Sequence, residues 1–508
     1  MLLLSILLYF LLLFVISRIT GGRGDNGTFY RARRQAPWYM VAFGMVGASI
    51  SGVTFVSVPG MVQVSDMTYL QTCIGFVFGY VLVAFVLLPI YYRLNLTTIY
   101  TFLKQRLGNR SYKTGASFFL LSKMAGASVR FYLACVILHQ FAVIPILNSL
   151  SPQPSTFNPQ LSFPLTVIIV VGLIWLYTRR GGIGTLVWTD TLQTVFMFTA
   201  LLLIIYMVIS QLGMNVGEAV QAIAADSHSR IFVFDDWVSK QNFWKQFFSG
   251  IFIVVVMTGL DQDMMQKNLT CKTLRDAQKD MCTYGFAFLP ANLLFLSLGV
   301  LLVLLFQQQG TALPEASDQL LPIFVEGNPS TLNLQPSTLP SLGEGLGVGV
   351  LFVLGIVAAS FSSADSALTA MTTSFCVDIC DKPDDERLRK RIHLLMAVVF
   401  AVFILLFGLL NSTSIIDAIY VMCSYTYGPL LGLFAYALWM QKKHADRKMD
   451  IHSDRLVPYI AVASPLLCFA LDAATRYLFN YQFGYELLMV NGLLTFAGLS
   501  LANRIFRT

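Results

Sequence analysis

Long apolar runs, each bounded by charged residues, proline or glycine, recur along the whole chain and constrain its fold more than any other feature. A helix needs about 20 mostly apolar residues to cross the hydrocarbon core of a bilayer. Open strands and loops cannot cross, because their backbone groups would lack hydrogen-bond partners. We therefore expect an all-α polytopic membrane protein. The thirteen expected helices are at residues 1–18, 38–60, 68–92, 113–147, 161–178, 183–210, 243–266, 279–306, 345–380, 388–410, 412–440, 455–476 and 480–505.

The composition agrees with that expectation and excludes several classes of protein. Hydrophobic residues make up 56% of the chain and charged residues only 12%, whereas soluble domains are typically about 25% charged. A soluble enzyme, a nucleic-acid-binding protein and a disordered scaffold are therefore excluded. The eight cysteines are scattered without a CxxC pair, and the five histidines are dispersed without HExxH. We expect no cofactor, no transition-metal centre and no disulfide.

The distribution of basic residues predicts the orientation of the chain. Cytoplasmic loops of membrane proteins are enriched in Lys and Arg. With the N-terminus outside and the C-terminus inside, the predicted inner loops hold 28 of the 34 basic residues, and the predicted outer loop 307–344 holds none. The first run has no positively charged N-terminal region and no small-residue cleavage site, so we interpret residues 1–18 as an extra helix rather than a signal peptide.

The missing motifs narrow the function further. The chain has no GxxxxGK[ST] motif, which disfavours ATP-driven transport, and no GxSxG motif that would indicate a hydrolase. Secondary active transport is the leading hypothesis, ahead of an enzyme. A channel and a solute sensor are its rivals, and saturable accumulation driven by a gradient would separate transport from a channel.

Two of the expected helices carry the residues of a broken span. The segment 36–60 contains Gly44, Gly47, Gly52 and Gly60 among four Ser and Thr residues, and 249–262 contains two further glycines. Small polar residues also serve helix packing, but transporters use such breaks at mid-membrane depth to present backbone carbonyls to ions and substrate. Helices within 38–210 and within 243–440 would then form two five-helix halves, each beginning with a broken helix.

The ninth expected helix carries the densest group of polar side chains. Ser362, Asp365, Ser366 and Thr369 are spaced i, i+3, i+4 and i+7, so they share one helix face, and Ser363 lies beside them. Carboxylate and hydroxyl oxygens are hard ligands that suit an alkali cation. A charged residue inside a span is costly and therefore a candidate functional residue. The alternative is a packing face on which Asp365 pairs with a base.

Three more charges lie within expected spans: Asp190, Lys123 and Arg130. Lys123 and Arg130 are seven residues apart and share a helix face. One interpretation is a buried ion-pair network, with Asp365, that only holds helices together. The other assigns Asp190 to a cation and Arg130 to an anionic group of the substrate.

Several segments, in their order along the chain, resemble the sodium:solute symporter family. They are Pro59–Gly60, PIYYRLNLTTIYTFLKQRLG (89–108), GASVRFYL (126–133), GGIGTLVWTDTLQ (181–193), DQDMMQKNL (261–269), the serine-rich ninth helix and YGPLLGLF (427–434). The resemblance implies a five-plus-five inverted-repeat, LeuT-like core with one helix before it and two after it, within 455–508. It also implies alternating access with Na⁺ as the coupling ion.

The family's main sodium site lies between the first broken helix and the serine-rich helix. Carried over residue by residue, the resemblance implies carbonyl ligands at Gly47, Ile50 and Ala359 and hydroxyl ligands at Ser362 and Ser363. Family members often have alanine where this chain has Gly47. A carbonyl ligand needs no Cβ, so we expect the site to persist.

The resemblance also implies a possible second cation site, because some members, notably sialic acid symporters, hold a second sodium with the aspartate that matches Asp190 and nearby hydroxyls. Ser366 matches one of them, whereas Asp365 stands where the family has a hydroxyl. Asp365 is therefore expected to bind a cation, to carry a proton or to pair with Arg130.

The substrate candidates implied by the resemblance are Ser51, Thr54 and Gln71, to which Arg130 is added from its own charge. The arginine that holds a carboxylate in sialic acid symporters has no match, because Gly126 lies near its place. A sugar, a sugar acid, an amino acid and a carboxylate all remain open as solutes. We expect a multi-pass protein of the plasma (inner) membrane that imports a small polar organic solute with Na⁺. The alternatives are a solute sensor of the same fold and a proton-coupled symporter.

Overall fold

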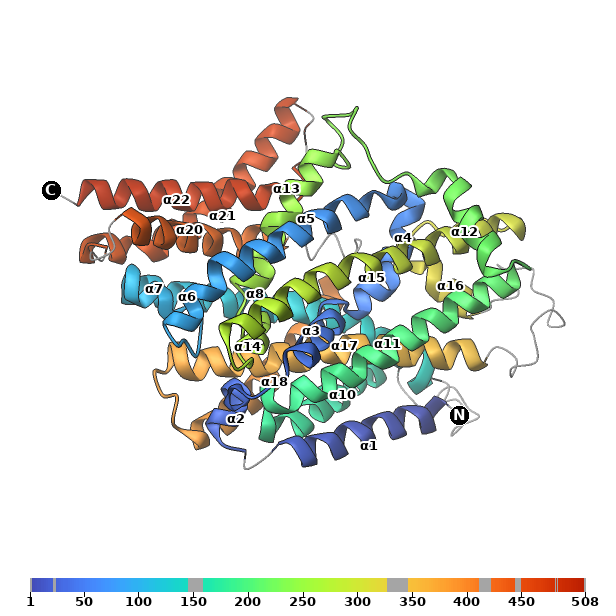
Figure 1. Ribbon diagram of the computed structural model, residues 1–508, viewed down its shortest axis with the longest axis horizontal. Coiled ribbons are helices and arrows are strands. Elements are labelled where there is room, and N and C mark those ends of the chain that lie inside the picture. Colours follow the sequence, from blue (N-terminus) through green and yellow to red (C-terminus); the bar gives the residue numbers. More distant parts are fainter. Residues whose placement is uncertain are drawn as a thin grey trace.

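The computed structural model describes residues 2–21, 24–144, 159–326, 346–410, 422–443, 449–479, 481 and 483–506. Within these residues the chain is helical and has no strand, apart from one isolated bridge between Ala36 and Cys271. In chain order the α-helices are α1 (Leu2–Thr20), α2 (Asn26–Arg31), α3 (Trp38–Ser49), α4 (Gly52–Ser65), α5 (Tyr69–Leu82), α6 (Leu88–Arg93), α7 (Thr101–Arg106), α8 (Asn109–Leu138), α10 (Pro159–Gly181), α11 (Ile183–Gln211), α12 (Val216–Ala225), α13 (Phe243–Val254), α14 (Gln262–Asn268), α15 (Leu274–Gln308), α16 (Leu320–Glu326), α17 (Leu346–Ser374), α18 (Glu386–Leu410), α20 (Gly428–Lys443), α21 (Ile451–Phe479) and α22 (Leu487–Ile505) (Figure 1).

Each of the thirteen expected segments overlaps a helix, although 412–421 lies outside the described residues. By length and apolar composition, nine helices of the described chain are able to cross a membrane, or ten if the bent pair at 243–268 forms one span. Helix α3 is shorter than that criterion requires, and the part of α1 to which it was applied is Leu4–Thr20. That count also treats Gly52–Arg93 as one span, although a turn with φ 54° at Asp66 separates α4 from α5.

Both expected breaks are present. At the first break, helix α3 ends at Ser49 and helix α4 begins at Gly52, and Ile50 between them has φ −80° and ψ 88°. In the second, α13 continues through a π-helical turn (Val255–Gly259), and α14 then leaves at 70°. The glycines allow close helix contacts there: a Cβ on Gly52 would overlap the hydroxyl of Ser360 on α17.

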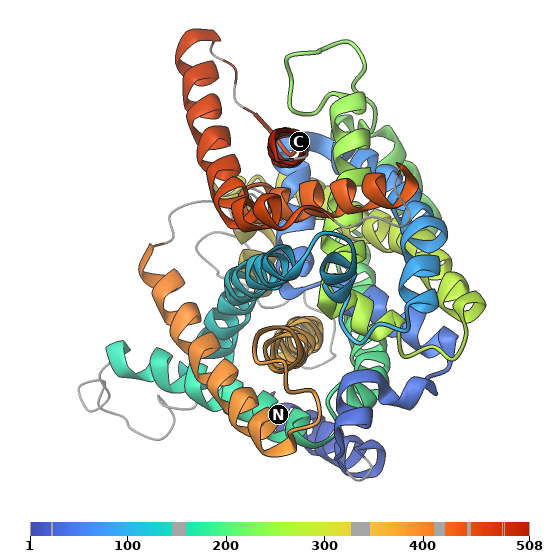
Figure 2. The same cartoon turned by 90° about the vertical axis from the view of Figure 1, so that its left-hand side faces the viewer.

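Helix α17 lies at the centre of the bundle. Figure 2 looks nearly along this helix, which other helices surround. It packs against α11, α8, α18, α3 and α4. A helix surrounded by protein can carry polar side chains that lipid would not tolerate. The serine-rich segment of α17 is therefore placed where its hydroxyls meet other protein groups.

The surfaces of α18 and α21 are apolar and exposed, as expected for helices that face lipid. On α18, Leu394, Val398 and Val402 follow one another at helical spacing, and each exposes about half of its surface. On α21, Tyr459, Val462 and Leu466 are similarly exposed. Bare apolar stripes of this length on a folded protein indicate contact with an apolar environment.

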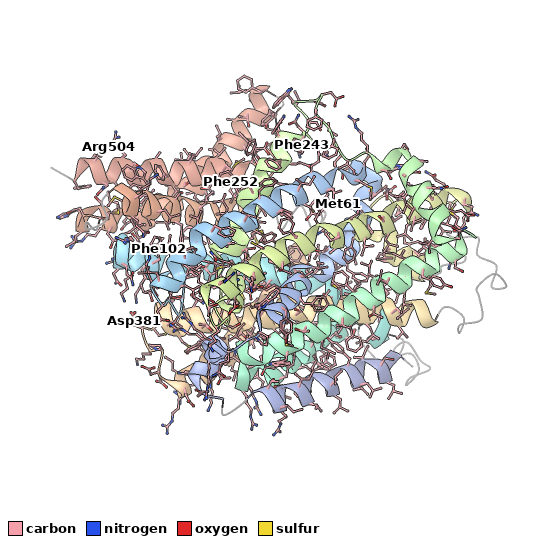
Figure 3. The ribbon with its side chains drawn as sticks, viewed as in Figure 1. Met61, Phe102, Phe243, Phe252, Asp381 and Arg504 are labelled. Carbon is pink, nitrogen blue, oxygen red and sulfur yellow. The ribbon has the colours of Figure 1, made fainter. Side chains whose placement is uncertain are left out.

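Residues from distant parts of the chain meet at one end of the bundle. Phe102, Asp381 and Arg504 lie at the same end (Figure 3). Asp381 forms ion pairs with Lys113 at 3.0 Å and Lys104 at 3.5 Å. The hydrogen bond from Lys113 holds the pKa of the Asp381 carboxyl below its usual value. This end carries charges that are paired and accessible to water.

Candidate functional site

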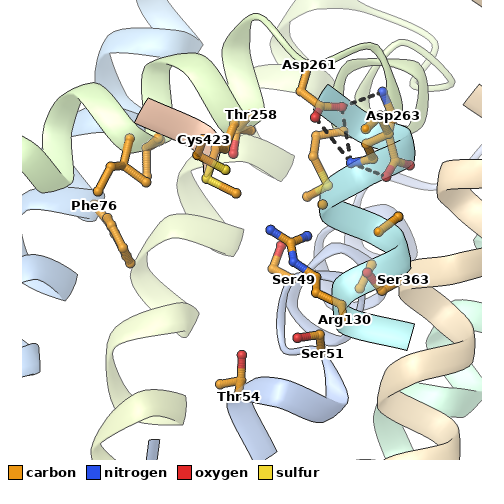
Figure 4. A pocket seen from close by; sticks show the side chains of 18 of the residues that line it. Ser49, Ser51, Thr54, Phe76, Arg130, Thr258, Asp261, Asp263, Ser363 and Cys423 are labelled. Carbon is orange, nitrogen blue, oxygen red and sulfur yellow. Dashed lines mark hydrogen bonds and ion pairs between the residues drawn. The ribbon is translucent and has the colours of Figure 1, made fainter. Parts of the chain in front are cut away.

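A cavity of about 110 Å³ lies where the two broken helices meet α8, α15 and α17. Hydroxyl groups of the first break and of α17 line it, together with charged groups of α8 and of the second break (Figure 4). Its polar and charged lining residues include Ser51, Thr54, Lys123, Arg130, Asp261, Asp263 and Ser363. Every one of these side chains comes from a predicted broken helix or from a helix with predicted intramembrane charges or hydroxyls.

The predicted sodium ligands lie on facing elements. Gly47 lies in the last turn of α3, and Ile50 lies in the break. Ala359, Ser362 and Ser363 lie on two consecutive turns of α17, and α17 contacts both α3 and α4. The break also changes the backbone hydrogen bonds. The N–H of Ser51 donates to the carbonyl of Ser49 at 3.1 Å instead of continuing the helical ladder to Gly47. The Gly47 carbonyl is thereby released from the bond it would make in an unbroken helix.

The two serines of this group differ in their contacts. Ser362 is fully buried, and its hydroxyl donates to Oδ1 of Asp190 at 2.8 Å. Ser363 is 8% exposed and lines the cavity. Ser363 therefore faces the cavity, whereas Ser362 links the site to Asp190.

Gly47 is explained by packing. A Cβ at this position would overlap the hydroxyl oxygen of Thr194 and approach Thr194 Cβ to 2.8 Å. Thr194 is held in place because its hydroxyl donates to the Asp190 carbonyl at 2.6 Å. The glycine thus allows α3 to lie directly against α11.

Asp190 has a partner that the sequence did not indicate. Its Oδ2 lies 2.7 Å from Nζ of Lys267, and both side chains are at most 3% exposed. Lys267 was counted above among the bases of an inner loop, but α14 turns back into the bundle after the 70° bend and places it inside. One interpretation of the sequence was an ion-pair network among Asp190, Asp365, Lys123 and Arg130. Its pairing is wrong, because the partner of Asp190 is Lys267.

Asp365 is fully buried and accepts hydrogen bonds from Tyr177 at 2.6 Å and from Ser366 at 3.3 Å. Across the described residues no basic side chain forms an ion pair with it. The expected pair with Arg130 is not formed, since Arg130 lines the cavity instead. Two of the three predicted second-site residues, Asp365 and Ser366, contact each other, and Asp190 is linked to the same face of α17 through Ser362.

Lys123 binds the second helix break. Its Nζ lies 3.2 Å from Asp261 and 2.7 Å from Asp263, and all three side chains are more than nine-tenths buried. The hydroxyl of Tyr427 also donates to Asp261 at 2.6 Å. From the sequence, these two acids were part of the segment DQDMMQKNL (261–269) and carried no predicted role. Two carboxylates directly after Gly259 in an apolar run were the signal that would have identified them.

The predicted substrate residues divide into two groups. Ser51, Thr54 and Arg130 line the cavity, and Arg130 reaches toward its middle near Ser49 (Figure 4). Gln71 does not line it. The Gln71 amide donates to the Gln241 carbonyl at 2.9 Å and accepts from the Val233 N–H at 3.1 Å, which ties it to the segment between α12 and α13.

Known proteins share this sequence pattern and fold. The model of the sodium:solute symporter family matches residues 29–447. A sodium/sialic acid symporter of Aliivibrio fischeri is 24% identical over 82% of this chain and 78% of its own length. A sodium-dependent multivitamin transporter of Oryctolagus cuniculus is 25% identical over 86% of this chain and 65% of its own. A solved Na⁺-coupled sialic acid symporter in a substrate-bound outward-open state superposes with a TM-score of 0.78 at 17% identity, covering 99% of this chain and 98% of that one.

Proposed function

Because this chain belongs to the sodium:solute symporter family, whose model matches residues 29–447, we propose that it imports a small polar organic solute by alternating access. It is a multi-pass membrane transporter with an all-helical, LeuT-like fold, and not an enzyme. Na⁺ is its coupling ion, as in its curated relatives. The plasma (inner) membrane is its proposed location.

The proposed architecture is two five-helix halves, 38–210 and 243–440, with one helix before them at 1–18 and two after them within 455–508. The breaks at Ile50 and Leu260, one near the start of each half, support this division. Thirteen spans with the N-terminus outside remain our proposal for the topology. The clustering of Phe102, Asp381 and Arg504 at one end supports it, because all three lie in or next to predicted inner loops (Figure 3).

The proposed coupling site binds Na⁺ through the carbonyls of Gly47, Ile50 and Ala359 and the hydroxyls of Ser362 and Ser363. The observation that carries it is the break between α3 and α4, which faces the hydroxyls of α17 and interrupts the helical ladder at Ser51. A bound ion would hold the broken helix against α17. It would therefore favour the conformation in which this contact is closed and the solute cavity is formed.

A second cation near Asp190, Asp365 and Ser366 is supported by charge. Two carboxylates and one ammonium, that of Lys267, share this buried group, which leaves one negative charge in excess. A buried, uncompensated charge is costly in a low-dielectric interior. Na⁺ or a proton would remove the cost, and the proton keeps proton-coupled symport as the second candidate function.

We place the solute in the cavity, in contact with Ser51, Thr54 and Arg130. The guanidinium of Arg130 suits a negatively charged group, since it presents several donors at once. Relatives carry sialic acid or vitamins with sodium, and this chain is expected to carry a solute with at least one negative charge. Gln71 would become a contact only if it left its bonds to the α12–α13 segment.

Uptake into proteoliposomes tests the proposal. Protein reconstituted in K⁺-loaded vesicles should accumulate radiolabelled solute when the outside contains NaCl, and accumulation should stop when KCl or choline chloride replaces NaCl. Collapse of the Na⁺ gradient with an ionophore should release the accumulated solute. Accumulation that follows an imposed pH gradient, and is unchanged by Na⁺, would instead support the proton-coupled alternative.

A further inference from the structure

The wall of the cavity contains a group of three buried charges with one negative charge in excess. Lys123 lies between Asp261 and Asp263, at 3.2 and 2.7 Å. Asp261 is further satisfied by the hydroxyl of Tyr427 and by the Asp263 N–H at 2.8 Å. Asp263 is not: its Oδ1 is buried and accepts no hydrogen bond from any described residue. The side chain of Asp263 is only 5% exposed, and it lines the cavity.

A positive charge outside this group, that of Arg130, also lines the cavity. Arg130 lies two helical turns from Lys123 on α8, and its guanidinium makes no ion pair or hydrogen bond with the described residues. Figure 4 shows the Arg130 side chain apart from Asp261 and Asp263 and beside Ser49. The cavity therefore has a net negative group at one place and a positive group at another.

Each of these groups needs a counter-charge. A buried carboxylate oxygen without a donor carries a desolvation cost that a ligand would remove. The partly exposed guanidinium of Arg130 presents several donors that a ligand could accept. A solute with only a negative charge would satisfy Arg130 and leave Oδ1 of Asp263 without a donor. A neutral solute would satisfy neither of the two charges fully.

We propose that the solute is a small zwitterion, whose carboxylate or other anionic group binds Arg130 and whose ammonium group binds Asp263. This rests on the proposed function, because it names the solute of the same transport site. The cavity volume of about 110 Å³ suits a molecule of a few heavy atoms, since an engineered cavity of about 150 Å³ holds benzene.

The charge preference is tested with a panel of small compounds, in which alanine and 4-aminobutyrate have an anionic and a cationic counterpart of similar size. Alanine, proline, glycine betaine and 4-aminobutyrate are the zwitterions, propionate and butyrate the anions, ethylamine and butylamine the cations, and glucose the neutral control. The midpoint of thermal unfolding of the full chain in detergent is measured with each, in NaCl and in KCl. A ligand that binds the folded state raises the midpoint. We expect a rise with at least one zwitterion in NaCl, and none with its anionic or cationic counterpart.

The variant Asp263→Asn sharpens the test, because it removes the excess negative charge and leaves Lys123 paired with Asp261. The affinity for the zwitterion should fall about tenfold or more, while the affinity for the matching anion should rise. Asp263→Glu keeps the charge and should keep the preference for the zwitterion. Asp235→Asn is the matched control, because this acid is 78% exposed in the segment between α12 and α13, and its removal should change neither affinity.

The outcomes separate this proposal from the proposed function. Stabilisation by an anion or by glucose without any zwitterion would overturn it, as would no stabilisation by any zwitterion. Equal weakening of zwitterion and anion in Asp263→Asn would also overturn it, because Asp263 would then have only a structural role. A zwitterion that stabilises equally in NaCl and KCl would support zwitterion recognition and contradict sodium coupling instead.

Discussion

Among single residues, Ser363 offers the most direct test of the sodium site. Ser363→Ala removes a hydroxyl that lines the cavity without creating a large void. If this hydroxyl is a ligand, the Na⁺ concentration for half-maximal uptake should rise roughly tenfold, as expected for the loss of one contact to a charged group. Uptake measured against Na⁺ concentration gives that value.

The matched control is Ser57→Ala, which removes a buried hydroxyl on α4 that has no hydrogen-bond partner among the described residues. It should leave the Na⁺ dependence unchanged. An unchanged Na⁺ dependence in Ser363→Ala as well would remove Ser363 from the proposed site.

Gly47 provides a second prediction at this scale, about packing. Gly47→Ala should destabilise the protein by about 1–3 kcal/mol, because the new methyl group overlaps Thr194. Thr194→Ala in the same chain should restore much of the loss, since it removes the hydroxyl oxygen that overlaps the new methyl group most closely. A double-mutant cycle on the unfolding temperature measures this coupling; additive effects of the two changes would show that the clash is relieved elsewhere.

Residue types predicted the cavity better than they predicted its ion pairs. Ser51 and Thr54 were predicted from the family resemblance, and Arg130 was predicted from its charge within an apolar run. Lys267 was assigned to a loop because a base at the end of an apolar run usually marks the membrane surface. Its true position depends on the 70° bend between α13 and α14, and residue spacing does not encode that angle.

At the scale of elements, the ion pair between Asp190 and Lys267 connects α11 to α14, the helix that follows the second break. Lys267→Met should leave Asp190 buried without its ammonium partner and destabilise the protein by about 3–5 kcal/mol. Asp190→Asn added to Lys267→Met should recover most of the stability, because the buried group then has one excess negative charge, that of Asp365, as it does in the native chain. Thermal unfolding in detergent measures both effects, and equal losses in the single and double variants would contradict the pairing.

At the level of elements, the two breaks were predictable because glycine and serine interrupt apolar runs near mid-membrane depth. The exact ends of the helices were less predictable. Helix α4 continues through Pro59 and on to Ser65, beyond the expected end at residue 60. Proline inside a helix is tolerated here because a buried span can satisfy the freed carbonyl elsewhere.

Across the whole molecule, one short segment before the first broken helix closes an end of the bundle. We call residues 24–37 the inner clamp. Arg389 donates to the Gly24 carbonyl at 2.7 Å and its guanidinium lies 4.5 Å from the ring of Phe29, which is fully buried. Gln266 of α14 donates to the Tyr30 carbonyl at 2.9 Å. The clamp thus ties α3 to α14 and α18 at the end predicted to face the cytoplasm.

Opening of that end requires the inner clamp to release, and Cys271 is a native reporter of the event. Cys271 is fully buried, and Ala36 of the clamp pairs with it through a backbone bridge.

Arg389→Gln removes the bond to Gly24 and the contact with Phe29, so it should raise the population of the inward-open state. In KCl, maleimide should therefore modify Cys271 several times faster in Arg389→Gln than in the native chain. NaCl should slow this modification in both proteins, because bound Na⁺ favours the conformation in which the broken helix is held closed. Mass spectrometry of the Cys271 peptide measures the rate, with Cys271→Ala as the blank. Equal rates in the two proteins would mean that Arg389 does not control this end of the bundle, and the closure would then depend on Gln266.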